Sequence, residues 1–210
     1  MRTIPLAFLL LVTSIGLEGC QLGISALVDR DELIKSANPA SMKVNLLATA
    51  RDVRPSQGNH AGRHTFTLFM IPTFEVKVQN GALNQTIPAY LKEGLESSGY
   101  DVTMVNELSQ ADGPSLVVQI DELKNNLFSW LYPLGIVTGG AKFCLALVDS
   151  DGKTMWVRET EGNSGVMLSL LYMSGFETRV KDDLTTNLSQ MLQIVGSDEF
   201  KSVLRNAQAS

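Results

Sequence analysis

Two stretches of the chain carry apolar residues at the spacing of an amphipathic helix. In the first, Ile87, Leu91 and Leu95 recur every four residues, and Gly99 supplies the left-handed residue that commonly ends a helix. The second and longer stretch covers residues 176–195 and keeps an apolar residue at every fourth position. Its stripe consists of Phe176, Val180, Leu184, Leu188 and Leu192. The pattern therefore predicts two main helices, each amphipathic on one side.

Elsewhere the chain shows the short apolar runs that are typical of strands. The predicted strands are residues 42–50, 65–78, 100–105, 115–122, 142–148 and 154–159. The turn residues at 149–152 favour a hairpin between the last two strands, and residues 52–63 are expected to form a loop. The order of strands and helices predicts the α+β class, with a mostly antiparallel or mixed sheet and two main helices packed on one face.

One apolar segment, residues 127–140, does not fit a simple strand pattern. Pro133, Gly135 and the Gly139-Gly140 pair argue against a continuous strand or helix, so we expect an elongated hairpin tip or connection. A second apolar stretch, residues 166–173, stands at the next strand-to-helix junction. The two segments either complete the core together or form an exposed patch that contacts a protein, a membrane or a lipid. The candidate contact residues are Phe128, Trp130, Leu131, Tyr132, Leu134, Ile136, Leu171, Tyr172 and Met173.

The first twenty residues have the pattern of an exported lipoprotein. Arg2 is followed by an apolar run over residues 4–15, which is too short to span a bilayer. The run ends in Leu17-Glu18-Gly19-Cys20, which resembles the bacterial lipobox. We expect a signal peptide over 1–19, lipid on Cys20, a tether to residue 42 with one helical turn around residues 31–35, and a single periplasmic domain over 43–210. An ordinary signal peptide cut elsewhere and a buried apolar helix are the alternatives.

Composition argues against several classes of function. The 210 residues carry 17 Lys and Arg against 22 Asp and Glu, and no basic block, so we expect no nucleic-acid partner. Cleavage before Cys20 would leave Cys144 as the only thiol, so an internal disulfide is not expected. Cys144 itself is interpreted as a small core residue of a strand.

The candidate chemical groups do not form a catalytic pattern. His60 and His64 stand four residues apart, but the neighbouring glycines argue against a helix, and we expect solvated loop histidines. The adjacent carboxylates Asp121-Glu122 and Asp182-Asp183 are expected on solvated faces. Gly139-Gly140 lacks the Lys-Thr that follows the glycines of a phosphate-binding loop. The sequence thus predicts no enzyme, no cofactor and no metal.

Residues 91–102 resemble the helix-Gly-Tyr-x-Val unit of YajG-type bacterial lipoproteins. As in that family, a strand like residues 116–123, an aromatic strand at 155–158 and a carboxy-terminal Ser197-Asp198-Glu199-Phe200 unit follow. The layout is also similar to the lipoprotein activator LpoB and to the amino-terminal domain of TolB. The resemblance implies a non-enzymatic lipoprotein of the cell envelope.

From these features we expect a lipid-anchored protein on the periplasmic face of the outer membrane. Gln21 stands where an inner-membrane retention signal usually has Asp, which by resemblance to sorted lipoproteins favours the outer membrane. The protein would act as a binding or adaptor module for an envelope protein partner. The alternative is a lipid-handling accessory component of an envelope transport or lipopolysaccharide-assembly system.

Overall fold

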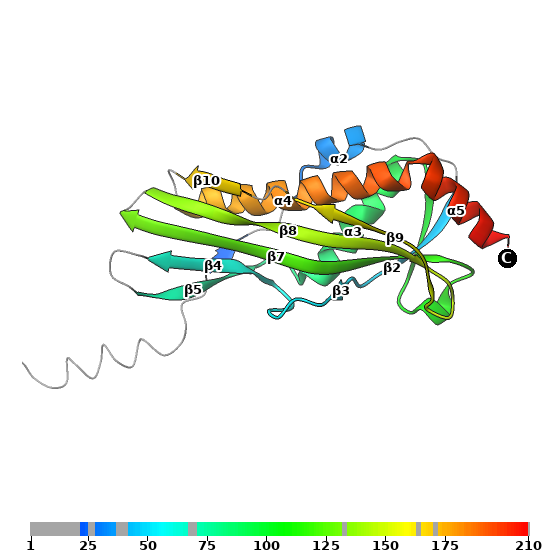
Figure 1. The fold of residues 1–210 in the computed structure, drawn as a ribbon, viewed down its shortest axis with the longest axis horizontal. Coiled ribbons are helices and arrows are strands. Elements are labelled where there is room, and N and C mark those ends of the chain that lie inside the picture. The colour runs from blue at the N-terminus through cyan, green and yellow to red at the C-terminus, as the bar shows by residue number, and fades with distance from the viewer. Residues whose placement is uncertain are drawn as a thin grey trace, which may run out of the picture.

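The computed structural model describes residues 22–24, 28–36, 42–66, 71–131, 134–162, 165–169 and 172–209. Its helices are α2 (Arg30–Ser36), α3 (Leu83–Ser97), α4 (Tyr172–Val195) and α5 (Asp198–Gln208), with a 3-10 turn, η1, at Leu108–Gln110. Its strands are β1 (Leu22–Ile24), β2 (Lys43–Leu47), β3 (Arg51–Asp52), β4 (His60–Phe66), β5 (Ile71–Val78), β6 (Asp101–Val105), β7 (Ser115–Leu131), β8 (Leu134–Val148), β9 (Thr154–Glu161) and β10 (Gly165–Ser169). Figure 1 shows the strands as one sheet with the helices on one side.

The two longest strands, β7 and β8, pair antiparallel along most of their length and form the spine of the sheet. The other edge of β7 pairs in parallel with β2, β3 and β4 in turn. The other edge of β8 pairs antiparallel with β10 near its start and with β9 near its end. From this spine the sheet continues through β2 to β6, and through β4 and β5 to β1. The sheet is therefore mixed, as predicted.

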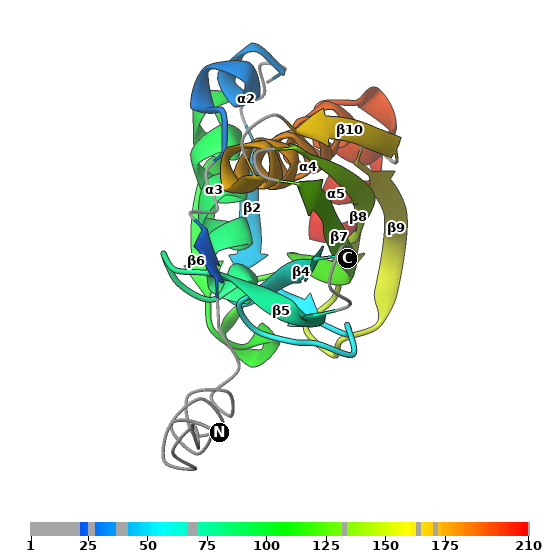
Figure 2. The same ribbon diagram turned by 90° about the vertical axis from the view of Figure 1, so that its left-hand side faces the viewer.

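The two main helices, α3 and α4, pack on the same face of this sheet. Figure 2, which looks along the strands, shows the sheet curving around α4. The predicted apolar stripe of α4 is almost fully buried: Phe176, Val180, Leu184, Leu188 and Leu192 are all 2% exposed or less. The α+β class with two main helices on one face is confirmed.

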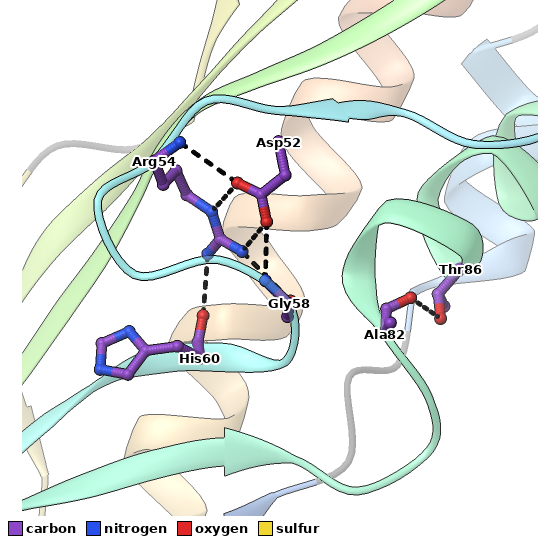
Figure 3. Close-up of polar contacts among 6 residues, drawn as sticks. All are labelled: Asp52, Arg54, Gly58, His60, Ala82 and Thr86. Atoms are coloured by element: carbon purple, nitrogen blue, oxygen red, sulfur yellow. Dashed lines mark hydrogen bonds and ion pairs between the residues drawn. The ribbon is translucent and has the colours of Figure 1, made fainter.

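The ends of the helices follow the sequence closely. Helix α3 begins three residues before Thr86, whose hydroxyl donates a hydrogen bond to the Ala82 carbonyl at 3.0 Å (Figure 3). It ends before Gly99, whose φ of 82° is the predicted left-handed stop. Helix α5 begins at Asp198 and is capped by Ser197, whose side chain accepts a hydrogen bond from the Phe200 amide at 3.2 Å.

The segment expected to be a tether belongs in large part to the fold. Strand β1 pairs in parallel with β5, and α2 packs on α4 and α3. Ile24 is 1% exposed and Leu33 is 2% exposed, so both lie in the core. The expectation of a tether up to residue 42 is therefore wrong for β1. The helical turn expected around residues 31–35 is present as α2, but it packs on the domain instead of belonging to a linker. The expected signal peptide and Cys20 lie outside the described residues.

The expected hairpin around residue 132 is present, but its strands are longer than predicted. Strand β7 continues to Leu131 and β8 begins at Leu134, so Gly135 and the Gly139-Gly140 pair lie inside a strand. The expectation that these residues interrupt the strand is wrong. Among the described residues, no helix is both long and apolar enough to cross a membrane.

Candidate functional site

An uncovered apolar surface lies at the end of the β7–β8 hairpin, on the left in Figure 1. We call it the apolar end, and it consists of Phe128, Leu134, Ile136, Val166 and Leu168. The paired positions Phe128, Ile136 and Leu168 stand side by side on β7, β8 and β10. Because side chains alternate along a strand and the neighbours of these residues face the core, all three point away from α4.

The exposure of the apolar end is unusual for its residue types. Val166 is 73% exposed, Leu168 66% and Leu134 44%, while Phe128 and Ile136 are half-buried. Large apolar side chains that gather on one face, rather than singly, commonly mark a contact with a partner or a membrane. This surface is the strongest candidate for function among the described residues.

The structure brings part of the predicted contact set together. Phe128, Leu134 and Ile136, three of the candidate contact residues, lie at the apolar end. The backbone of Trp130 and Leu131 belongs to the end of β7, and that of Tyr172 and Met173 to the first turn of α4. Tyr132 and Leu171 lie outside the described residues.

Sequence reasoning did not single out Val166 and Leu168, the two most exposed members of the surface. Both lie in the apolar stretch that we noted, but Val166, Met167 and Leu168 are all apolar, so the sequence does not show which of them face outward. Strand β10 pairs with β8, so the two apolar segments do pack on each other. They nevertheless leave one face uncovered.

A buried polar cluster lies on the opposite side of the sheet, under α4. Asp183 is fully buried, which corrects the expectation of a solvated face, whereas Asp182 is exposed. The Arg179 side chain forms an ion pair with Asp183 (Nε to Oδ1, 3.3 Å) and donates to the Gly139 carbonyl at 2.7 Å. Burial raises the pKa of Asp183 to about 6, although Arg179 acts in the opposite direction.

The next turn of α4 extends this cluster along the sheet. The Asn187 amide donates to the Ala141 carbonyl at 3.3 Å, and its oxygen accepts from the Thr160 hydroxyl at 2.7 Å. The polar stripe Arg179, Asp183 and Asn187 thus links α4 to β8 and β9. We assign it a structural role, because its contacts join the helix to the sheet rather than leading to a cleft.

The two histidines lie on β4 rather than in a loop, which corrects the expectation for residues 60–63. Both side chains are half-buried, and burial lowers the pKa of each. The His64 Nε2 lies 2.7 Å from the hydroxyl of Ser129 on β7. These histidines are therefore parts of the packed sheet rather than solvated groups.

The loop before β4 is held by Arg54, which is only 4% exposed (Figure 3). Its guanidinium donates to the Asp52 carboxylate at 2.8 and 2.7 Å and to the His60 carbonyl at 2.8 Å. The same carboxylate accepts from the Gly58 amide at 2.9 Å. Because its guanidinium is hydrogen-bonded to Asp52 and to the backbone of the same loop, Arg54 stabilises the loop rather than offering a charge to a ligand.

Beside this loop lies an open depression of about 450 Å³ on the outer face of the sheet. Its charged lining residues include Arg63, Asp121, Glu122 and Lys124, which are of both signs. No group of three or more His, Cys, Asp or Glu among the described residues could hold a metal ion. The mixed charges do not define one class of ligand.

We expect Arg54→Lys to lower the free energy of unfolding by about 1–2 kcal/mol, because lysine retains the charge but not the fork of donors. Urea denaturation of the purified protein measures this loss. Arg51→Lys is the matched control, since Arg51 is exposed nearby on β3 and should change stability by less than about 0.5 kcal/mol. Equal losses for the two variants would contradict the role given to Arg54.

Comparison with known proteins places the fold but not the function. Neither protein-family models nor curated proteins match the sequence. Among solved structures, XCC0632 from Xanthomonas campestris, described by the family model DUF330, has a TM-score of 0.55 at 10% identity, covering 86% of this chain and 98% of its own. Further matches are an uncharacterized protein (TM-score 0.31, 9% identity, 87% and 98% covered) and the PelC dodecamer from Paraburkholderia phytofirmans (0.35, 14%, 74% and 92%).

The similarity to XCC0632 shows a shared fold, and at 10% identity it shows the fold alone. The other two TM-scores are too low to carry an argument. The expected resemblance to envelope lipoproteins is thus supported in part, at the level of a fold shared with a DUF330 protein.

Proposed function

We propose that this protein is a lipoprotein of the outer membrane, anchored on the periplasmic side through Cys20, and that it acts as a non-catalytic binding or adaptor module. The observation that carries the proposal is the position of β1 relative to Cys20 in the sequence. Cys20 stands two residues before Leu22, the first residue of β1, and Ile24 of that strand is in the core. Cleavage before Cys20 would remove residues 1–19 and keep β1 whole. A cut after β1 would remove a core residue.

The apolar end supports the binding role. Its five residues offer an uncovered apolar surface on a rigid sheet, and such a surface binds a membrane or a protein without further chemistry. Attachment to a membrane would raise the effective concentration of the protein near other envelope components. The surface and the anchor together are the features expected of an adaptor.

The alternative of a lipid-handling component has weaker support. A site that carries a lipid needs an apolar cavity. Two depressions on the described surface, of about 450 and 430 Å³, are both open and both lined by charged residues that include Glu122 and Lys124. Lipid that copurifies with the protein in a fixed ratio would favour this alternative.

The anchor is tested by Cys20→Ser. Cells that express the natural chain should incorporate labelled palmitate into the protein, and the protein should float with outer-membrane fractions on a density gradient. The Cys20→Ser variant should lose the label completely, because no thiol remains at the lipobox position. Cys144→Ser is the control and should keep the label. A natural chain without palmitate would refute the anchor.

A further inference from the structure

We propose that the apolar end docks on the lipid surface of the same membrane that holds the acyl chains of Cys20. The protein would then have two points of attachment, one covalent and one through side chains. This inference rests on the proposed function, because it requires the anchor. It identifies the lipid surface, rather than another protein, as the occupant of the apolar end.

The first support is the absence of charge from the sequence around this end. The described elements that reach this end belong to three sequence segments. They are residues 64–74, which include the end of β4 and the start of β5, residues 127–141 of the β7–β8 hairpin, and residues 162–176, which include β10 and the start of α4. None contains Asp, Glu, Lys or Arg, although 19% of the whole chain is charged. Protein interfaces usually have a polar and charged rim, whereas charge is costly to place in lipid. The composition favours lipid.

The opposite end of the sheet shows the contrast within the same protein. The connection between β6 and β7, residues 106–114, contains Glu107 and Asp112, and the β8–β9 turn contains Asp149, Asp151 and Lys153. These connections have the polar composition that is normal for surface loops. The lack of charge is therefore a property of one end and not of the whole surface.

The second support is the position of the anchor along the strands. One row of paired residues crosses the sheet from β1 to β10 and consists of Leu22, Val76, Gly62, Asn125, Gly139 and Gly165. Leu168 lies three residues beyond this row, which is about 10 Å along a strand. Cys20 is two residues before Leu22, so the chain between them spans at most about 7 Å.

Because of the direction of β1, its amino-terminal end points to the hairpin side of this row of paired residues, which is the side on which Leu168 lies. Strand β1 runs parallel to β5, and β5 begins with Ile71 at the end of the sheet where the β7–β8 hairpin turns. The amino-terminal end of β1, at Leu22, is therefore directed toward the apolar end. An anchor at Cys20 would hold Leu168 near the level of the lipid headgroups, because no long tether separates the cysteine from the fold.

Docking in this way would fix the orientation of the protein on the membrane. The strands would stand away from the lipid surface, and α5 at the far end of the molecule would point into the periplasm (Figure 1). The charged connections of that far end would then be the groups presented to a protein partner.

The test uses the acylated full chain with Cys144→Ser as background, reconstituted into vesicles of phosphatidylethanolamine and phosphatidylglycerol. Val166→Cys carries an environment-sensitive fluorophore at the apolar end. Val157→Cys is the matched control, because Val157 is 45% exposed on β9, also opposite an outward position of β8, but near the other end. We expect nitroxide-labelled lipid to quench the fluorophore at 166 severalfold more than that at 157, with a blue shift at 166 only.

Equal quenching at 166 and 157 would overturn lipid docking, as would access of soluble iodide to both positions. Leu168→Cys, at a site 66% exposed, repeats the measurement at a second position. The background variant without an added cysteine reports on the anchor separately. It should take up no fluorophore when the Cys20 sulfur carries lipid, and it would be labelled if Cys20 were a free thiol.

Discussion

Alanine in place of Gly139 is expected to lower the free energy of unfolding by about 3–5 kcal/mol. Gly139 has a φ of 137°, which a residue with a side chain rarely adopts. A Cβ atom there would overlap the Lys124 carbonyl oxygen and lie 2.8 Å from the Asn125 Cα. Both atoms belong to the backbone of β7, the paired strand, so no side chain can move aside. The central hairpin would have to shift to admit one methyl group.

Gly165→Ala is the matched control for this prediction. Gly165 pairs directly with Gly139, but a Cβ atom at Gly165 would have no neighbour within 4 Å. Its replacement should change stability by less than about 0.5 kcal/mol. Urea denaturation followed by circular dichroism compares the two variants with the natural chain. If both alanine variants unfold at the same urea concentration as the natural chain, the close contact around Gly139 is not rigid.

The example of Gly139 shows why the hairpin was only partly predictable. Glycine usually weakens a strand, and we therefore expected an interruption. The alternation of Val137, Ala141 and Phe143 on one side of β8 continues through the glycine, and it was the better signal. The need for glycine comes from the backbone of the neighbouring strand β7, which a Cβ atom would overlap, and from the positive φ. These contacts join segments far apart in the sequence, so local patterns do not show them.

Asp183 illustrates the same limit for the polar residues of α4. The apolar stripe predicted the helix correctly, and polar residues beside such a stripe usually face solvent. Here the sheet curves around α4 and also covers the polar stripe of Arg179, Asp183 and Asn187. Carbonyl groups of β8 accept hydrogen bonds from this stripe, and the sequence gives no information on where those carbonyls lie. Burial of Asp183 follows from the tertiary structure alone.

Short segments were the other source of error. Strand β1 has three residues and α2 has seven, which is too few for a periodic pattern to be recognised. Turn-forming and charged residues dominated the composition there and predicted a tether. Ile24 and Leu33 are buried by contacts with elements distant in the sequence, and such contacts cannot be predicted from single apolar residues. The apolar end was predictable because its composition departs from that of an ordinary loop over a longer stretch.

Arg179→Met is expected to lower the free energy of unfolding by about 3–5 kcal/mol near pH 7.5, because it leaves the buried Asp183 carboxylate without its counter-charge. Asp183 has a folded-state pKa of about 6, raised above the ordinary value of 3.8, so between these values the folded protein binds more protons than the unfolded chain. The contribution of Asp183 to stability therefore falls as the pH rises through this range. Loss of Arg179 should raise the folded-state pKa further and extend the range upward.

The loss of unfolding free energy in Arg179→Met, relative to the natural chain, should consequently be smaller near pH 5 than near pH 7.5. Near pH 5 Asp183 is protonated in the variant and carries no charge. Thermal unfolding of both proteins at the two pH values measures this. The double variant Arg179→Met with Asp183→Asn is the control, because it removes both charges and should be more stable than the single variant near pH 7.5. A deficit that is the same at both pH values would mean that solvent reaches Asp183 when Arg179 is gone. The ion pair would then contribute to the contact between α4 and the sheet through its hydrogen bonds and packing, and not through a buried charge.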